Sequence, residues 1–181
     1  MEKVELNKDI KLSPHFTLGE LTKTKYVTAD GNIPSRVVIE NLIRVCGWLE
    51  ELRVLAGVRP QSKVAGDCTL APDPGAALDP GAAPSERKEV PIVINSGYRS
   101  PEVNRLAGGA ANSNHLTGCA VDIRCAGKVQ MIRYASILLD IADGTKREFD
   151  ELLLEQHGSV CWLHFAVRPK ENRSRISFLK A

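Results

Sequence analysis

SNHLTGCAVD, at residues 113–122, sets an imidazole and a carboxylate on either side of a glycine. His115 precedes Gly118, and glycine can take the positive φ angle of a tight turn, so the imidazole can fold back toward Asp122. Apolar and polar residues alternate over residues 118–124, which predicts a strand with Asp122 on the face opposite its apolar side chains. WLHFAV, at residues 162–167, alternates in the same way and sets His164 opposite its own apolar side chains.

These three polar side chains have the chemistry of a catalytic zinc site. Two imidazole nitrogens and a carboxylate oxygen suit Zn²⁺, and three protein ligands leave a fourth position for water. We therefore predict that His115, Asp122 and His164 are the metal ligands.

Three ordered motifs resemble the zinc D-alanyl-D-alanine carboxypeptidases and their phage and bacterial endopeptidase relatives, part of the LAS metallopeptidases. The motifs are S-G-Y-R-S-P at residues 96–101, S-x-H-x-x-G-x-A-x-D at residues 113–122 and W-x-H at residues 162–164. F-T-L-x-E-L, at residues 16–21, is similar to the segment that opens these domains. The resemblance implies a hedgehog/DD-peptidase-like fold and a zinc peptidase. Its substrate would be a peptidoglycan stem peptide, cut at a bond involving D-alanine.

One position departs from this family pattern. Many relatives carry an acidic residue three positions before the last histidine, and this chain carries Cys161 there. Peptide hydrolysis needs a base that later protonates the leaving amine. The nearest upstream carboxylate is Glu155, in a strand-like run that can form a hairpin with the His164 strand. We predict that Glu155 is the general base.

Cys161 leaves two alternatives open. As a fourth ligand it would close the zinc site and make it structural. Alternatively, the protein is a catalytically weakened module that keeps the pocket and binds cell-wall peptides.

Arg99 follows a predicted strand and a Ser-Gly turn, where its planar group of donors can bind a carboxylate or a peptide carbonyl. In the resembling family the matching arginine helps to bind substrate near the zinc, and the positions of Tyr98 and Ser113 line the same pocket. We predict a catalytic and substrate-binding role for Arg99, and substrate binding for the other two. The alternative is that Arg99 pairs with Asp122 or Glu102 and fixes its loop.

Periodicity predicts an α+β fold, with a small antiparallel sheet flanked by helices. Thr17 is expected to cap a short helix before Glu20. Two long amphipathic helices are expected, one from Pro34-Ser35 to Gly57 and one over residues 127–142, closed by Asp143-Gly144. The other expected elements are a short helix over residues 101–106 and strands over residues 90–95, 118–124, 149–155 and 161–167.

Residues 61–89 interrupt this pattern. They are rich in Pro, Gly, Ala and Asp, and D-P-G-A-A occurs at both Asp73 and Asp79. Such a stretch cannot build a core of its own, so we expect a low-complexity insertion. With 181 residues, the chain is then a single domain over residues 1–181.

The composition excludes several classes of function. The formal net charge of +2 does not favour nucleic-acid binding. The basic run at residues 168–175 is expected to be a solvated end, or a segment that favours an anionic wall polymer. Five cysteines without regular spacing do not form a secreted disulfide framework, and Cys46, Cys119 and Cys125 are expected to be buried thiols.

No apolar run is long enough to be a transmembrane segment, and the first residues lack the apolar core of a signal peptide. We therefore expect a soluble, monomeric protein made in the cytoplasm, with the cell wall as its site of action after release.

Overall fold

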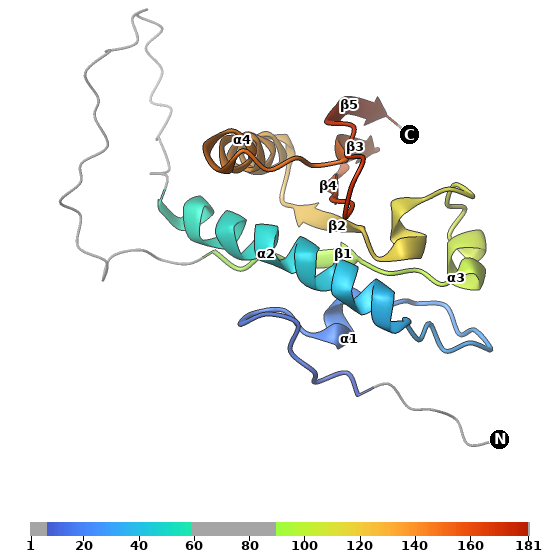
Figure 1. Ribbon diagram of the computed structural model, residues 1–181. Helices are drawn as coiled ribbons and strands as arrows, with labels where there is room; N and C mark the ends of the chain where they lie inside the picture. The colour runs from blue at the N-terminus through green and yellow to red at the C-terminus, as the bar shows by residue number, and fades with distance from the viewer. Residues whose placement is uncertain (1–6, 59–89, 181) are drawn as a thin grey trace, which may run out of the picture.

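The strands form one five-stranded sheet in the order β1-β2-β4-β3-β5, in a computed structural model that describes residues 7–58 and 90–180. They are β1 (Ile94–Ser96), β2 (Ala120–Cys125), β3 (Glu151–His157), β4 (Val160–Ala166) and β5 (Arg175–Lys180). Figure 1 shows them following one another from β5 to β1. Neighbours are antiparallel except for β3 and β5, which run parallel, so the predicted antiparallel sheet has one parallel pair. The predicted α+β class is confirmed.

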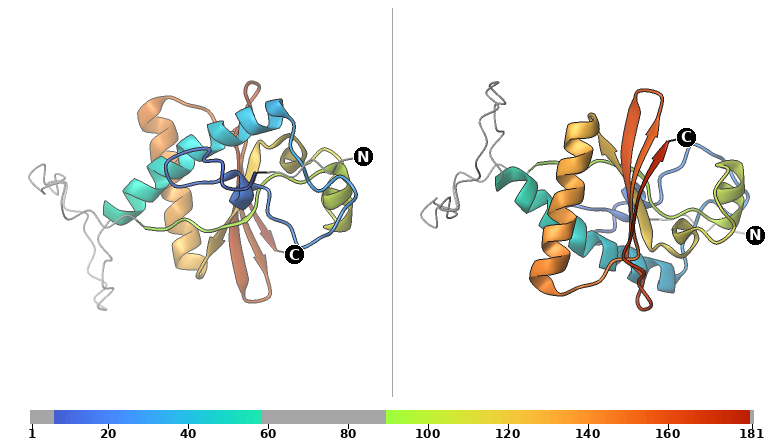
Figure 2. Two further views of the ribbon diagram at one scale, coloured as in Figure 1. Left: turned by 90° about the horizontal axis from the view of Figure 1, so that it is seen from below. Right: turned by 90° about the horizontal axis from the view of Figure 1, so that it is seen from above.

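The sheet has one apolar and one polar face. Leu152, Phe165 and Val121 are partners across β3, β4 and β2, and all three are fully buried. Successive side chains on a strand point to opposite faces, so the next row, which contains His164 and Asp122, faces the other way. Helices α2 (Arg36–Val58) and α4 (Lys128–Thr145) pack on the apolar face. Figure 2 shows α4 on one side of the sheet and α3 (Pro101–Leu106) on the other.

The long helices extend past their predicted ends. Gly57 lies inside α2, and Gly144 lies inside α4, which ends at Thr145. A glycine inside a helix costs only about 1 kcal/mol relative to alanine, less than the packing of a helix face can supply. Lys146 takes the left-handed conformation after α4, with a φ of 56°.

The amino-terminal segment supports the loop that precedes α3. Thr17 and Glu20 form a capping box around α1 (Leu18–Leu21), as the sequence predicts. The Leu21 carbonyl accepts a hydrogen bond of 2.7 Å from the Tyr98 backbone N–H. Gly97 lies so close to this carbonyl that a Cβ there would stand 2.3 Å from the Leu21 oxygen.

Two predicted segments are wrong in detail. The strand expected at residues 90–95 runs from Ile94 to Ser96, and its register with β2 shifts between these two residues. The basic run at residues 168–175 is not a free end, because Arg168 and Arg173 pair with the fully buried Asp150. Strand β5 then follows along β3, and the sequence interpretation missed it.

The insertion predicted at about residues 61–89 lies outside the described residues. Within the described part of the chain, no helix is both long and apolar enough to cross a membrane. Cys46, Cys119 and Cys125 are buried free thiols, as predicted.

Candidate metal centre

A short 3₁₀ helix, Asn114–Thr117, holds the first predicted ligand. The Ser113 hydroxyl accepts a hydrogen bond from the His115 backbone N–H and caps this turn. Gly118 ends it with a φ of 71°, the left-handed conformation that glycine adopts at little cost. A Cβ at Gly118 would also lie 2.8 Å from the Val38 carbonyl oxygen, so the turn packs directly on α2. The glycine of the motif is therefore required by both its conformation and its packing.

His115 has its tautomer fixed by the backbone. Its Nδ1 lies 2.6 Å from the Gly97 carbonyl oxygen, which can only accept a hydrogen bond. Nδ1 therefore carries the hydrogen, and Nε2, 3.2 Å from Asp122 Oδ1, is the atom that faces the site. This is the usual arrangement of a metal-ligating histidine, whose second nitrogen donates to a carbonyl or a carboxylate.

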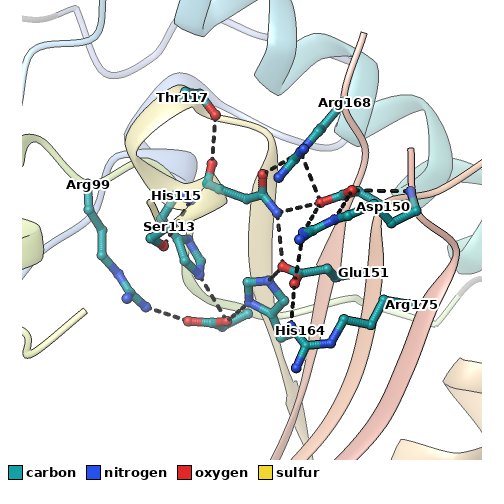
Figure 3. A network of polar contacts seen from close by, with 12 residues as sticks. Arg99, Ser113, His115, Thr117, Asp150, Glu151, His164, Arg168 and Arg175 are labelled. Atoms are coloured by element: carbon teal, nitrogen blue, oxygen red, sulfur yellow. Dashed lines mark hydrogen bonds and ion pairs between the residues drawn. The ribbon is translucent and has the colours of Figure 1, made fainter. Parts of the chain in front are cut away.

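His164 and Asp122 come from neighbouring strands and are direct register partners. The Nδ1 atom of His164 lies 3.0 Å from Asp122 Oδ1. Together with His115, these residues offer three ligand atoms that all lie within 4.8 Å of one another. All three side chains are buried, and Figure 3 shows the rings of His115 and His164 turned toward each other. Two imidazoles and a carboxylate suit zinc. Among the described residues, this is the one group of three or more His, Cys, Asp or Glu side chains that could hold a metal ion.

The charges of the three side chains are strongly coupled. Burial opposes the ionisation of Asp122, but His115 and His164 outweigh it and hold the pKa of the carboxyl well below its usual range. Burial likewise opposes the charged form of His164, but hydrogen bonds to Asp122 and Glu151 raise its pKa to about 9. The site thus holds an anionic carboxylate between two imidazoles, an arrangement that a divalent cation would also stabilise.

Glu155 lies on the same side of the sheet as the metal ligands. Its partner on β4 is Trp162, which lies two residues before His164 on the same face of the strand. Glu155 is therefore a diagonal neighbour of His164. A cavity of about 370 Å³ is lined by Glu155, Ser113 and Arg99 together with the three ligands. Burial raises the pKa of Glu155, and Asp122 raises it further, while His164 and Arg99 act in the opposite direction. A carboxylate in a cleft with a raised pKa suits the role of a general base.

Cys161 lies on the other face of the sheet. It precedes Trp162 in β4, pairs with Cys125 on β2 and is 4% exposed within the hydrophobic core. Alternation along the strand therefore points its sulfur away from His164. The alternative in which Cys161 is a fourth ligand of a structural zinc site is wrong.

Arg99 makes one of the ion pairs that the sequence left open. Its Nη2 donates to Asp122 Oδ2 at 2.5 Å, and its Nε donates to the Ser96 hydroxyl at 2.8 Å. Glu102 does not take this place, because its carboxylate accepts from the Ala29 backbone N–H. Arg99 also lines the cleft beside the metal ligands.

Tyr98 is placed differently from the prediction. Its side chain is 7% exposed and belongs to the hydrophobic core, and it does not line the cleft around the metal ligands. Its backbone carbonyl instead accepts from the Asn32 side chain. Apolar packing of the aromatic ring explains why it turns inward from the loop.

Glu151 is a site residue that the sequence interpretation missed. Its Oε2 lies 3.6 Å from Nε2 of His164, on the side of the ring away from Asp122. Asn114 donates to the same carboxylate at 2.9 Å, and Arg173 and Arg175 pair with its other oxygen. Alternation could have found it, since Glu151 and Glu155 are four residues apart on one face of β3.

Comparison with known proteins places the site in a family. The sequence profile described as peptidase M15 matches residues 80–147, which include Arg99, His115 and Asp122. Residues 80–147 form a peptidase M15 family domain. This is a zinc D-Ala-D-Ala carboxypeptidase family, so the resemblance found from the motifs is confirmed. His164 follows the matched segment, and the structure brings it to the other two ligands. No curated protein matches the chain.

Proposed function

We propose that this M15 metallopeptidase is a zinc enzyme that hydrolyses peptidoglycan stem peptides at a bond involving D-alanine. The observation that carries the proposal is the buried group of His115, Asp122 and His164 at the base of a cleft that also holds a carboxylate. The three ligands are contributed by two strands and a tight turn, so the protein supplies a rigid site.

His115, Asp122 and His164 would hold the zinc ion, which would lower the pKa of a water molecule and polarise the scissile carbonyl. His115 and His164 each turn one ring nitrogen toward the site. The other nitrogen contacts the Gly97 carbonyl in His115 and the Glu151 carboxylate in His164. Glu155 would take the proton of the attacking water and return it to the leaving amine. Arg99 would bind a carboxylate or carbonyl of the peptide with the donors that Asp122 and Ser96 leave available.

The experiment is digestion of purified muropeptides by the zinc-loaded protein, followed by mass spectrometry. The expected result is loss of D-alanine or cleavage of a crosslink that contains it. A Glu155→Gln variant should bind zinc normally and lose at least about a hundredfold in kcat, the usual contribution of a general base. Glu148→Gln, an exposed site outside the cleft, is the matched control and should keep full activity.

A second candidate function is a module that binds wall peptides without cleaving them. The favouring observation is that Cys161, where many relatives carry an acidic residue, points into the core. Binding of muropeptides by the zinc-loaded protein, without any product after prolonged incubation, would support this function over hydrolysis.

A further inference from the structure

A second cavity, with a volume of about 510 Å³, adjoins the metal cleft. Its walls are the segment at residues 23–26 after α1, strand β1, the Arg124 side chain of β2 and one side of α3. Arg99 and Ala107 line both cavities. A molecule held at the metal centre could therefore extend into this second cavity without leaving the protein surface.

The lining of this cavity carries only positive charge. Lys23, Lys25, Arg99 and Arg124 line it, and no Asp or Glu does. Asp122 offsets the charge of Arg99 through their ion pair. Among the residues that the structure describes, the other three have no ion-pair partner, although Lys25 lies 5.2 Å from the centre of the Tyr26 ring. Uncompensated cations around a hollow surface attract an anionic group.

Arg124 fixes the position of this cavity relative to the reaction site. It lies two residues after Asp122 on β2, so both side chains point to the polar face of the sheet. Two residues along a strand span about 7 Å, which is also the reach of two residues of an extended peptide. A substrate with its scissile carbonyl at the ligands would thus bring a side chain or terminus one or two residues away to the cations. Glu155 stays on the far side of Trp162, its partner on β4, which in turn pairs with Arg124.

We propose that the cavity lined by Lys23, Lys25 and Arg124 is a subsite for a carboxylate of the peptide substrate, one or two residues from the scissile bond. This proposal rests on the proposed peptidase function and adds a preference for acidic peptides to it. The carboxylate has two possible sources, an acidic side chain or a free carboxyl terminus, and each can be replaced by an amide without a change of shape.

The test uses pairs of peptides that differ in one group only. One pair carries Glu or Gln next to the scissile bond, and the other ends in a free carboxylate or an amide. We expect the zinc-loaded protein to favour the acid over the amide by about two- to fivefold in kcat/KM for one of the two pairs, the usual scale for a charged contact at a solvated site. The pair that shows the preference identifies the source of the carboxylate. The preference should shrink as salt is raised.

Variants then assign the preference to the cavity. Arg124→Gln and the double variant Lys23→Gln/Lys25→Gln should each reduce the ratio of acid to amide, and Arg124→Lys should restore most of it. Lys128→Gln is the matched control, because it removes one exposed positive charge at the start of α4, on the opposite side of the sheet, and should keep the wild-type ratio. Equal rates for acid and amide in both pairs, or a ratio that these variants leave unchanged, would overturn the subsite.

Binding measurements separate this proposal from the proposed function. The zinc-loaded protein is titrated with peptides whose amide nitrogens are methylated, so that they resist hydrolysis, and Kd is compared for the acid and the amide. A preference that Arg124→Gln removes, in a protein that cleaves no peptide, would refute the peptidase function and support the subsite. Cleavage of both members of a pair without any difference in Kd or rate would support the peptidase function and refute the subsite.

Discussion

Asp122 and His164 are 42 residues apart in the chain and face each other as register partners of β2 and β4, with Oδ1 and Nδ1 separated by 3.0 Å. The antiparallel ladder therefore sets the spacing of two metal ligands, and the 3₁₀ turn needs to bring only the third, His115. Buried Val121, Ile123, Leu163 and Phe165 on the opposite face hold this register. A slip of one residue would move either ligand to the apolar face.

Replacement of His115 by alanine should release the metal. Nε2 of His115 is one of three ligand atoms, and its loss leaves only two. Loss of a residue that merely supports a ligand typically lowers metal affinity about 10- to 100-fold, so loss of a ligand itself should lower zinc affinity by more than that. Metal content after dialysis checks this directly. His157→Ala, at the exposed end of β3, is the control and should keep its zinc. Full zinc in the His115→Ala protein would contradict the proposed ligand set.

Glu151→Gln should weaken zinc binding without removing a ligand. The carboxylate of Glu151 lies 3.6 Å from Nε2 of His164, where it can orient the ring and increase the basicity of the ligating nitrogen. Zinc affinity should fall by about 10- to 100-fold, as measured by competition with a chelator. Glu148→Gln removes an exposed carboxylate near the start of the same strand and should have no effect.

Cys161→Ser should keep its zinc and lose stability. Cys161 is 4% exposed within the core, so a serine hydroxyl there would be buried without a hydrogen-bond partner. This should lower the free energy of unfolding by about 1–3 kcal/mol. Zinc content and a urea unfolding curve test both parts. Loss of zinc in a protein that remains folded would contradict the placement of this side chain in the core.

The sequence predicted what depends on local alternation and missed what depends on distant partners. The strands that carry Asp122 and His164 show clear period-two patterns, and each gave the correct face for its ligand. Strand β5 was missed because the basic run at residues 168–175, which leads into it, resembles a solvated tail. Only the folded structure brings Arg173 of this run to Asp150. Tyr98 was expected in the pocket by family resemblance, but its ring packs in the core of this chain.

Asp150→Asn should destabilise the protein and change its response to acid. The carboxylate is fully buried, accepts from Asn114 at 2.7 Å and pairs with Arg168 and Arg173, so its loss removes one anionic partner from each of the two arginines. We expect the free energy of unfolding to fall by about 1–3 kcal/mol at pH 7, because both arginines are partly solvated.

The direction of the pH effect follows from the pKa of Asp150. Burial would raise this pKa, but Arg173, Asn114 and Arg168 hold it below its usual value. A lowered folded-state pKa stabilises the protein above the unfolded value of about 3.9, and this contribution is lost as the pH falls through the folded pKa. Unfolding curves measured between pH 7 and pH 3 should show a smaller loss of stability in Asp150→Asn than in wild type. An equal loss in both proteins would mean that Asp150 is not among the groups that set acid stability.

Gly97→Ala should damage the metal site from a distance. A Cβ at Gly97 would stand 2.3 Å from the Leu21 carbonyl oxygen, so α1 and the loop at residues 96–99 would have to separate. The Gly97 carbonyl holds Nδ1 of His115, and its displacement would free the ring that the site needs in one tautomer. Both the melting temperature and the zinc affinity should therefore fall.

Gly144→Ala is the matched control, because a Cβ at Gly144, in the last turn of α4, would meet nothing within 4 Å. Alanine in a helix gains up to about 1 kcal/mol over glycine, so the melting temperature should rise slightly. A Gly97→Ala protein that melts lower yet binds zinc as wild type does would show that the Gly97 carbonyl does not position His115.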